Sequence, residues 1–201
     1  RVKRILSSEI TPWHQACLNT ASMIGIPQVN DLNNFDEDIG MSTSPVNIVD
    51  GVRWNTAFAY LDPLRDNDRL TIQAQTHVDR LHLQNNRVDV VEAISPEGPL
   101  TIHAGTVVIC AGTYGSPAIL LRSGIGPASE LRVLGIETKL DRAVGKNLHD
   151  HPAVYLKYSG SPQLVAAMLD FVAGGGILFS EQTIAKFRSR YCTSAYDLHL
   201  F

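Results

Sequence analysis

The sequence carries little excess charge of either sign and few cysteines. Its 17 Lys and Arg residues against 20 Asp and Glu residues give a formal net charge of -3 at pH 7. Nucleic acids and anionic membrane surfaces are recognised by clustered Lys and Arg, so this composition argues against both as partners. The cysteines, Cys17, Cys110 and Cys192, lie far apart and match neither a zinc-site spacing nor a disulfide framework, which favours a reducing compartment.

The sequence also lacks a long apolar run. No hydrophobic stretch approaches the roughly 20 residues that span a bilayer, and the N-terminal residues lack the apolar core of a signal peptide. We therefore expect no membrane span and a cytoplasmic location. The chain begins with Arg1 rather than Met and stops inside the apolar run 198–201, so we expect an internal piece of a longer protein.

The remaining composition is typical of a folded globular protein, with 44% hydrophobic and 18% charged residues in a chain of 201. Thr11 and Pro12 precede apolar residues at helical spacing, and Gly25 follows them. This pattern predicts a helix that begins at Pro12 and ends near Ile24. The Asn- and Asp-rich region 29–50 predicts an irregular excursion that folds against another part of the protein.

The region from 70 to 110 consists of short runs rich in Val, Ile and Thr. Asn85-Asn86 and the segment 95–99 are typical of turns, so we expect a small antiparallel meander. Residues 107–110 are continuously apolar, which predicts a strand covered on both faces in a parallel sheet. The predicted strands cover residues 70–74, 77–84, 87–94, 100–104 and 106–110.

Beyond residue 110, predicted helices and strands alternate. Helices are expected over 116–122 and 129–134, followed by a strand over 136–140. We expect a domain change near residue 151, and after it a strand over 154–158, a helix over 164–172 and a last strand over 195–201. The expected fold class is α/β, with mixed α+β character.

Two glycine-containing segments are candidates for a nucleotide-binding edge. Ala111 and Gly112 follow the apolar run 107–110, and small residues at the end of a buried strand let a cofactor approach the backbone closely. Gly124-Ile125-Gly126 resembles a phosphate loop, but Ser129 stands where a third glycine is required and the segment follows a predicted helix. It therefore fails the dinucleotide fingerprint.

Three segments together resemble one family. The run from Gly112 to Gly126, GTYGSPAILLRSGIG, is similar to the second signature of glucose-methanol-choline oxidoreductases. Residues 51–57, GVRWNTA, resemble the family's G-x-R-x-S/N-x-A segment, and residues 145–152, GKNLHDHP, resemble its G-x-N-L-x-D-H-P segment. Residues 197–201 are similar to a strand of the family's substrate domain, so the resemblance extends over nearly the whole chain.

The resemblance implies an FAD-binding domain with a mixed sheet, a meander and helices, joined to a substrate domain with an antiparallel sheet. It implies oxidation of a primary or secondary small-molecule alcohol by hydride transfer to FAD. It also implies that the Val78 backbone meets the adenine of FAD, with Ala111 and Gly112 close to the cofactor. The implied domains are residues 1–50 as a packing region, 51–150 as part of the FAD-binding domain and 151–201 as the start of the substrate-binding domain.

Two parts of the family pattern have no match here. The family's N-terminal Gly-rich motif for the FAD pyrophosphate is absent before Ile24, and its active-site histidine belongs to a segment beyond Phe201. We therefore predict no catalytic residue in this chain and expect companion polypeptide segments to carry the rest of the enzyme. The alternatives are a hydroxynitrile lyase on the same fold and an inactive fragment or binding module.

Three histidines are candidates for functional groups, because imidazole is a frequent base and metal ligand. His149 and His151 flank Asp150, but no third ligand accompanies them, so we expect structural hydrogen bonding and no metal site. His199 alternates with apolar residues in a strand pattern, which favours a structural role over a catalytic one.

Overall fold

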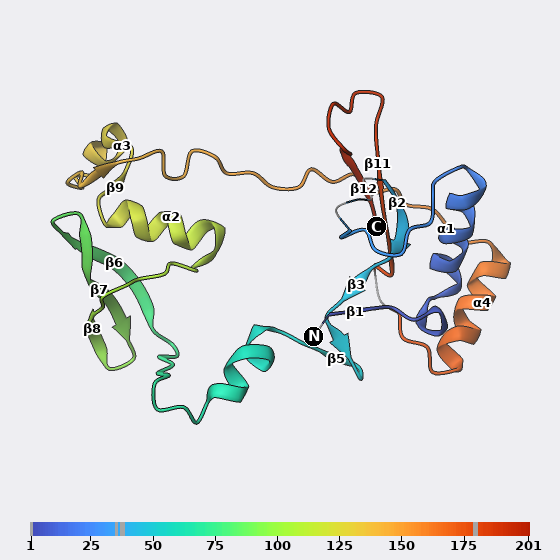
Figure 1. The fold of residues 1–201 in the computed structure, drawn as a ribbon, viewed down its shortest axis with the longest axis horizontal. Helices are drawn as coiled ribbons and strands as arrows, with labels where there is room; N and C mark the ends of the chain where they lie inside the picture. Colours follow the sequence, from blue (N-terminus) through green and yellow to red (C-terminus); the bar gives the residue numbers. More distant parts are fainter. Residues whose placement is uncertain (1, 35, 37–38, 179–180) are drawn as a thin grey trace. The chain divides into compact units, whose positions relative to one another are not determined.

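The computed structural model describes residues 2–34, 36, 39–178 and 181–201. The chain divides into two compact units (Figure 1). Unit 1 comprises residues 1–70 and 156–201, and unit 2 comprises residues 71–155. Residues 51–70, which we expected to group with 71–150, thus belong to unit 1. The assignment of the predicted ranges to an FAD-binding and a substrate-binding domain stays a prediction.

Unit 1 is built around a three-stranded antiparallel sheet and two helices. The sheet has the strand order β12 (Leu198–Leu200), β11 (Thr183–Phe187), β2 (Gly40–Thr43), with Ala185 opposite both Leu200 and Met41. Helix α1 (Pro12–Met23) contacts β2, β11 and α4 (Pro162–Ala173). The apolar core lies between α1 and the sheet and comprises Ile5, Ile10, Leu18, Ala21, Met41 and Ala185.

Helix α1 has the boundaries that its sequence predicts. The Thr11 hydroxyl accepts a hydrogen bond from the His14 backbone N–H, Pro12 occupies the first turn, and Gly25 follows the helix at φ +82°. The buried Gln182 then ties the cap to β11, because its Oε1 accepts from the Thr11 backbone N–H at 2.6 Å. Polar groups buried between α1 and β11 are thereby satisfied.

Short elements complete unit 1. Strands β1 (Lys3–Arg4) and β3 (Pro45–Val46) pair, as do β4 (Ile48–Val49) and β5 (Val52–Arg53). The remaining elements are the 3₁₀ turns η1 (Ser7–Glu9) and η3 (Asp62–Leu64) and the π-helical turn η2 (Ala57–Leu61).

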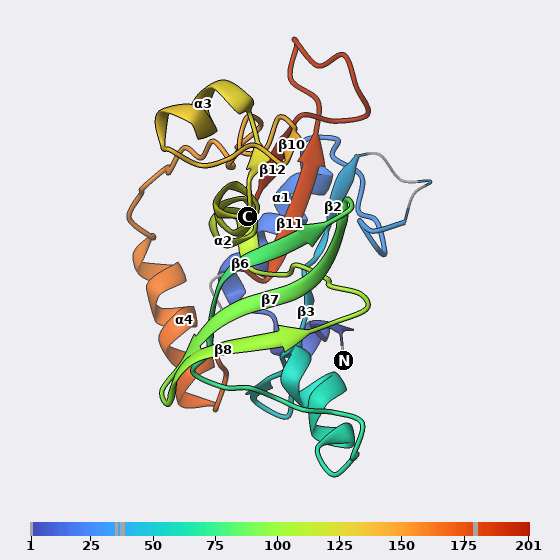
Figure 2. The ribbon, with the colours of Figure 1, turned by 90° about the vertical axis from the view of Figure 1, so that its left-hand side faces the viewer.

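Unit 2 joins a meander to helices. The meander consists of β6 (His77–Gln84), β7 (Arg87–Ser95) and β8 (Gly98–His103), drawn in green in Figure 2. Asn85 and Asn86 connect the first two strands with φ angles of +51° and +60°, as expected of a two-residue hairpin turn. Helix α2 (Gly112–Arg122) packs on β6, with Ile119 against Leu81 and Val91. The unit also contains β9 (Ile125–Gly126), α3 (Ala128–Val133) and β10 (Leu140–Asp141), with β9 and β10 parallel.

The fold class is as predicted: helices and sheets are mixed, and the meander over 77–103 is confirmed. The predicted buried strand over 106–110 is wrong. These residues form no strand; Val107 and Ile109 pack on the core, whereas Val108 is 78% exposed. The apolar run promotes an extended backbone, but a strand needs a neighbouring strand, and the described residues offer none.

Other predicted boundaries also differ. Residues 70–74 and 154–158 form no strand, and Val154 is 88% exposed. Helix α2 begins at Gly112 rather than at Ser116, so that Pro117 lies inside the helix. The Ser116 hydroxyl accepts from the Ala111 backbone N–H at 3.0 Å instead of capping a helix that starts at Pro117.

Among the described residues, no helix combines the length and apolar character required to cross a bilayer.

Candidate functional site

The three predicted cofactor residues gather at a hollow in unit 2. The hollow has a volume of about 640 Å³ and is walled by β6, the extended segment before α2, and α2 itself. Val78 and Ala111 both line it, although they lie far apart in the chain, and Gly112 is the next residue after Ala111. The structure therefore brings the predicted residues together at one surface.

The interior wall of the hollow is mainly apolar. Val78, Val107 and Ile109 are partly buried and pack against the core that Leu81, Val91 and Ile119 form. Apolar walls with a few oriented polar groups are typical of sites for flat organic groups. The lining residues with polar side chains are Thr76, His77, Tyr114 and Arg122.

Gly112 supplies an uncovered stretch of backbone beside the hollow. Its φ angle is +79°, a conformation that residues with a Cβ rarely adopt, and no atom lies within 4 Å of the place a Cβ would take. Ala111 and Gly112 are both exposed. The hollow thus combines an apolar wall with an open stretch of backbone.

The C-terminal end of α2 is fastened to β6. Arg122 Nε donates to the Asp79 carbonyl oxygen at 2.8 Å, and its Nη2 donates to the Val78 carbonyl oxygen at 3.4 Å. The buried Ser123 Oγ accepts from the Leu81 backbone N–H at 2.8 Å and donates to the Ile119 carbonyl oxygen at 2.6 Å. The family resemblance predicts Val78, but the sequence gives no sign of the role of Arg122, because nothing in the local pattern links positions on two different elements.

Asp79 lies between two guanidinium groups. Its carboxylate pairs with Arg80 Nε and with Arg122 Nε, both at 2.9 Å. The hydrogen bond from Arg80, and then the charges of Arg80 and Arg122, hold the pKa of Asp79 below its usual range. The carboxylate therefore stays ionised and keeps its bond to Arg122 at neutral pH.

Gly124-Ile125-Gly126 has a packing role here. The Gly124 carbonyl oxygen accepts from the backbone N–H groups of Lys139 at 2.8 Å and Leu140 at 3.2 Å. A Cβ at Gly124 would overlap the carbonyl oxygen of Glu137. The segment thus joins α2 to β9 and β10, in agreement with its failure to match a phosphate loop.

The rings of His149 and His199, and the backbone of His151, take part in structural contacts. His149 Nδ1 lies 3.2 Å from the Asn147 carbonyl oxygen, and the His151 backbone N–H donates to Asp150 Oδ1 at 2.7 Å. The ring of His199 stacks on Tyr196 with ring centroids 5.1 Å apart. The described part of the chain contains no group of three side chains that would hold a metal ion.

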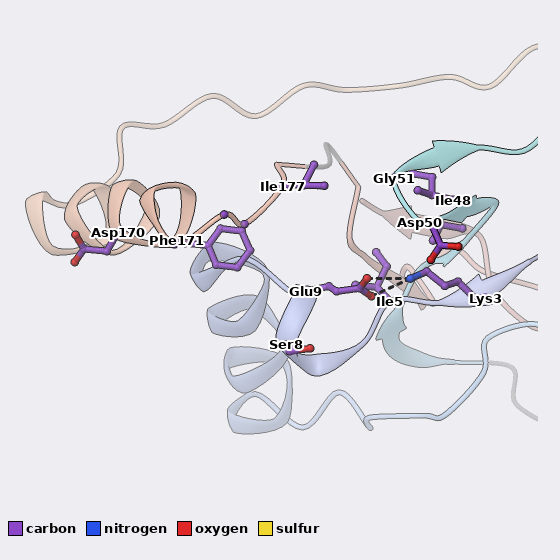
Figure 3. Close-up of a pocket in the computed structure, with 14 residues that line it drawn as sticks. Lys3, Ile5, Ser8, Glu9, Ile48, Asp50, Gly51, Asp170, Phe171 and Ile177 are labelled. Atoms are coloured by element: carbon purple, nitrogen blue, oxygen red, sulfur yellow. Dashed lines mark hydrogen bonds and ion pairs between the residues drawn. The ribbon is translucent and has the colours of Figure 1, made fainter.

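A second hollow, of about 540 Å³, lies in unit 1 (Figure 3). Lys3 donates to Glu9 at 2.9 Å on one wall, and Phe171 at the end of α4 lies on another. The Leu6 backbone N–H, followed by Lys3, lowers the pKa of Glu9. Gly174–Gly176 contributes to the wall beside Phe171.

We expect Gly176→Ala to destabilise unit 1 by about 1–3 kcal/mol. A Cβ at Gly176 would overlap the Phe171 ring, so the ring must leave its place. Gly174→Ala is the matched control: its φ of -76° suits any residue, and its Cβ would lie 3.4 Å from the nearest atom. Urea unfolding of both variants is the measurement, and equal midpoints would show that Phe171 does not require a glycine there.

Comparison with known proteins places these features in a family. The family model for GMC oxidoreductases matches residues 4–153. Pyridoxine 4-oxidase of Microbacterium luteolum is 33% identical over 187 residues, covering 85% of this chain and 36% of that protein. Mitochondrial choline dehydrogenase of Mus musculus is 34% identical over 148 residues, covering 73% of this chain and 25% of that protein.

Solved structures give the same result. A crystal structure of pyridoxine 4-oxidase from Mesorbium loti is 33% identical with a TM-score of 0.65, covering 70% of this chain and 27% of that one. An FAD-dependent oxidoreductase from Chaetomium thermophilum is 25% identical with a TM-score of 0.59, covering 65% and 23%. The chain thus spans between about a quarter and about a third of the length of these relatives. With the family model matching most of its length, this chain belongs to the GMC oxidoreductase family, whose N-terminal domain binds FAD.

Proposed function

We propose that this chain is part of an enzyme that oxidises a small-molecule alcohol by hydride transfer to FAD. The observation that carries the proposal is the hollow in unit 2 where Val78 and Ala111 meet beside the uncovered backbone of Gly112. Relatives named pyridoxine 4-oxidase and choline dehydrogenase support alcohol oxidation as the reaction class. The flavin, when bound, supplies the hydride acceptor.

The chain's own residues bind and orient the cofactor. The backbone of Val78 presents hydrogen-bonding groups to the adenine edge, and the apolar side chains of Val78 and Ile109 exclude water from its face. Gly112 allows close approach of the cofactor to the main chain because it has no side chain. In this assignment unit 2 belongs to the FAD-binding domain, and residues 151–201 begin the substrate-binding domain.

The groups that accept the alcohol proton belong, in this proposal, to the rest of the enzyme. The rings of His149 and His199 make structural contacts, and His77 is the one histidine among the residues that line the hollow beside Ala111. The relatives are roughly two and a half to three times as long as this chain, so companion segments supply the catalytic base and the flavin-ring pocket. A cytoplasmic setting remains a prediction from the scattered cysteines.

The test is to count the flavin released on denaturing the purified native protein and then to add alcohols without oxygen. Near-stoichiometric FAD that loses its visible absorption on addition of pyridoxine, choline or a simpler primary alcohol supports the proposal. Flavin that stays oxidised with alcohols while a cyanohydrin is cleaved would point to a hydroxynitrile lyase. Absence of bound flavin would point to an inactive fragment or binding module.

A further inference from the structure

Strand β6 carries a bulge beside the hollow. Val78 pairs with Ala93 and Arg80 pairs with Glu92, so Asp79 has no partner on β7. A bulge of this kind leaves the extra residue's backbone outside the ladder and bends the strand locally. Because β6 is at the edge of the three-stranded sheet, no further strand of the meander holds the bulge from the other side.

At the bulge, Arg122 supplies hydrogen bonds to the backbone of β6 that a neighbouring strand would otherwise provide. Its guanidinium group bonds the consecutive carbonyl oxygens of Asp79 and Val78 and pairs with the Asp79 carboxylate at 2.9 Å. The guanidinium group is planar and offers several donors in a fixed geometry, so one side chain defines the direction of both carbonyls. A carbonyl oxygen has two lone pairs, and the long 3.4 Å bond leaves Val78 able to accept a second donor.

The attachment of α2 to β6 does not depend on Arg122 alone. Ser123, the next residue, is buried and bonds the Leu81 backbone N–H independently. Ile119 anchors the preceding turn in the core with Leu81 and Val91. Loss of the Arg122 side chain therefore frees the bulge while leaving the helix in place.

We infer that Arg122 is a positioning residue, which holds the bulge at Asp79 so that the Val78 peptide faces the hollow in the orientation that receives the adenine of FAD. The inference rests on the proposed function, which assigns adenine to Val78. Without the hydrogen bonds from Arg122, the Val78 peptide samples several orientations. Binding of the cofactor must then order this peptide, which lowers the affinity. The flavin end of the cofactor does not touch Arg122 in this assignment.

The experiment uses native protein freed of its cofactor, with the variants Arg122→Met and Arg122→Lys. Arg132→Met is the matched control, because Arg132 also occupies the last turn of a helix but is exposed on α3. FAD affinity is measured by flavin fluorescence, and the affinity of ADP, which carries the adenine half alone, by competition with FAD. The visible spectrum at saturating FAD reports the flavin surroundings.

We expect Arg122→Met to lower the affinities for FAD and for ADP by the same factor, about tenfold or more. The visible flavin spectrum at saturating FAD should be unchanged. Arg122→Lys restores the affinity only in part, because an ammonium group cannot bond both carbonyls in one plane, and Arg132→Met leaves both affinities unchanged. The inference is overturned if Arg122→Met leaves the affinities intact, or if it alters the spectrum and the melting temperature together. If ADP does not compete with FAD on the unaltered protein, the adenine assignment itself has failed.

Discussion

Gly112→Val is expected to reduce flavin occupancy at least tenfold while the protein remains folded. The space around Gly112 is open, because no atom of the protein lies within 4 Å of the place that a Cβ would take. A valine side chain would therefore occupy the space through which the cofactor approaches the backbone next to Ala111, and would clash with it. The measurement is FAD released per protein chain, together with the far-ultraviolet circular dichroism of the variant.

Gly135→Val is the control that distinguishes two causes of flavin loss in Gly112→Val, namely steric exclusion of the cofactor and strain in the backbone. Gly135 has a φ of +70° and equally open surroundings, but it lies after α3, and neither it nor its sequence neighbours line the hollow, whereas Gly112 directly follows Ala111, which does. Both substitutions force a β-branched residue into a left-handed conformation, at a cost of about 1–3 kcal/mol. If the two variants lose flavin to the same extent, strain alone explains the loss and Gly112 is not at the cofactor.

Gly124→Ala is expected to destabilise unit 2 by about 4 kcal/mol, as the sum of left-handed backbone strain and overpacking. Gly124 has a φ of +81°, and its Cβ would overlap the Glu137 carbonyl oxygen and lie 3.0 Å from Lys139 Cγ. Backbone atoms cannot move aside as a side chain does. The strand pair β9 and β10, which depends on the Gly124 carbonyl, should separate from α2.

The control is Gly135→Ala, which introduces the same left-handed strain without a close neighbour. Urea unfolding of the two variants isolates the cost of the contact with Glu137. If Gly124→Ala is as stable as Gly135→Ala, the backbone of segment 136–140 moves away from the new Cβ at little cost in stability. The Gly-Ile-Gly segment would then have no packing role, and its place in the sequence signature would need another explanation.

Local signals in the sequence predicted those elements whose boundaries depend on nearby residues. The Thr11 cap and Gly25 define α1, and the Asn85-Asn86 turn defines the first hairpin, because capping and turn geometry involve residues only a few positions apart. The same signals failed for residues 106–110. An extended, apolar segment becomes a strand only when another strand lies beside it, and no local pattern states whether one does.

Short patterns along the chain were sufficient to predict the family and the meander. The candidates Val78, Ala111 and Gly112 stay predictions, and Val78 follows from the family resemblance alone. The tertiary structure was needed to bring Val78 and Ala111 to one hollow and to show that Arg122 bonds the bulge at Asp79. The pairing of β2 with β11, which lie far apart in the sequence, is also evident only from the tertiary structure. These relations depend on packing between distant segments, where register and side-chain direction are decided by the whole core and not by neighbours in sequence.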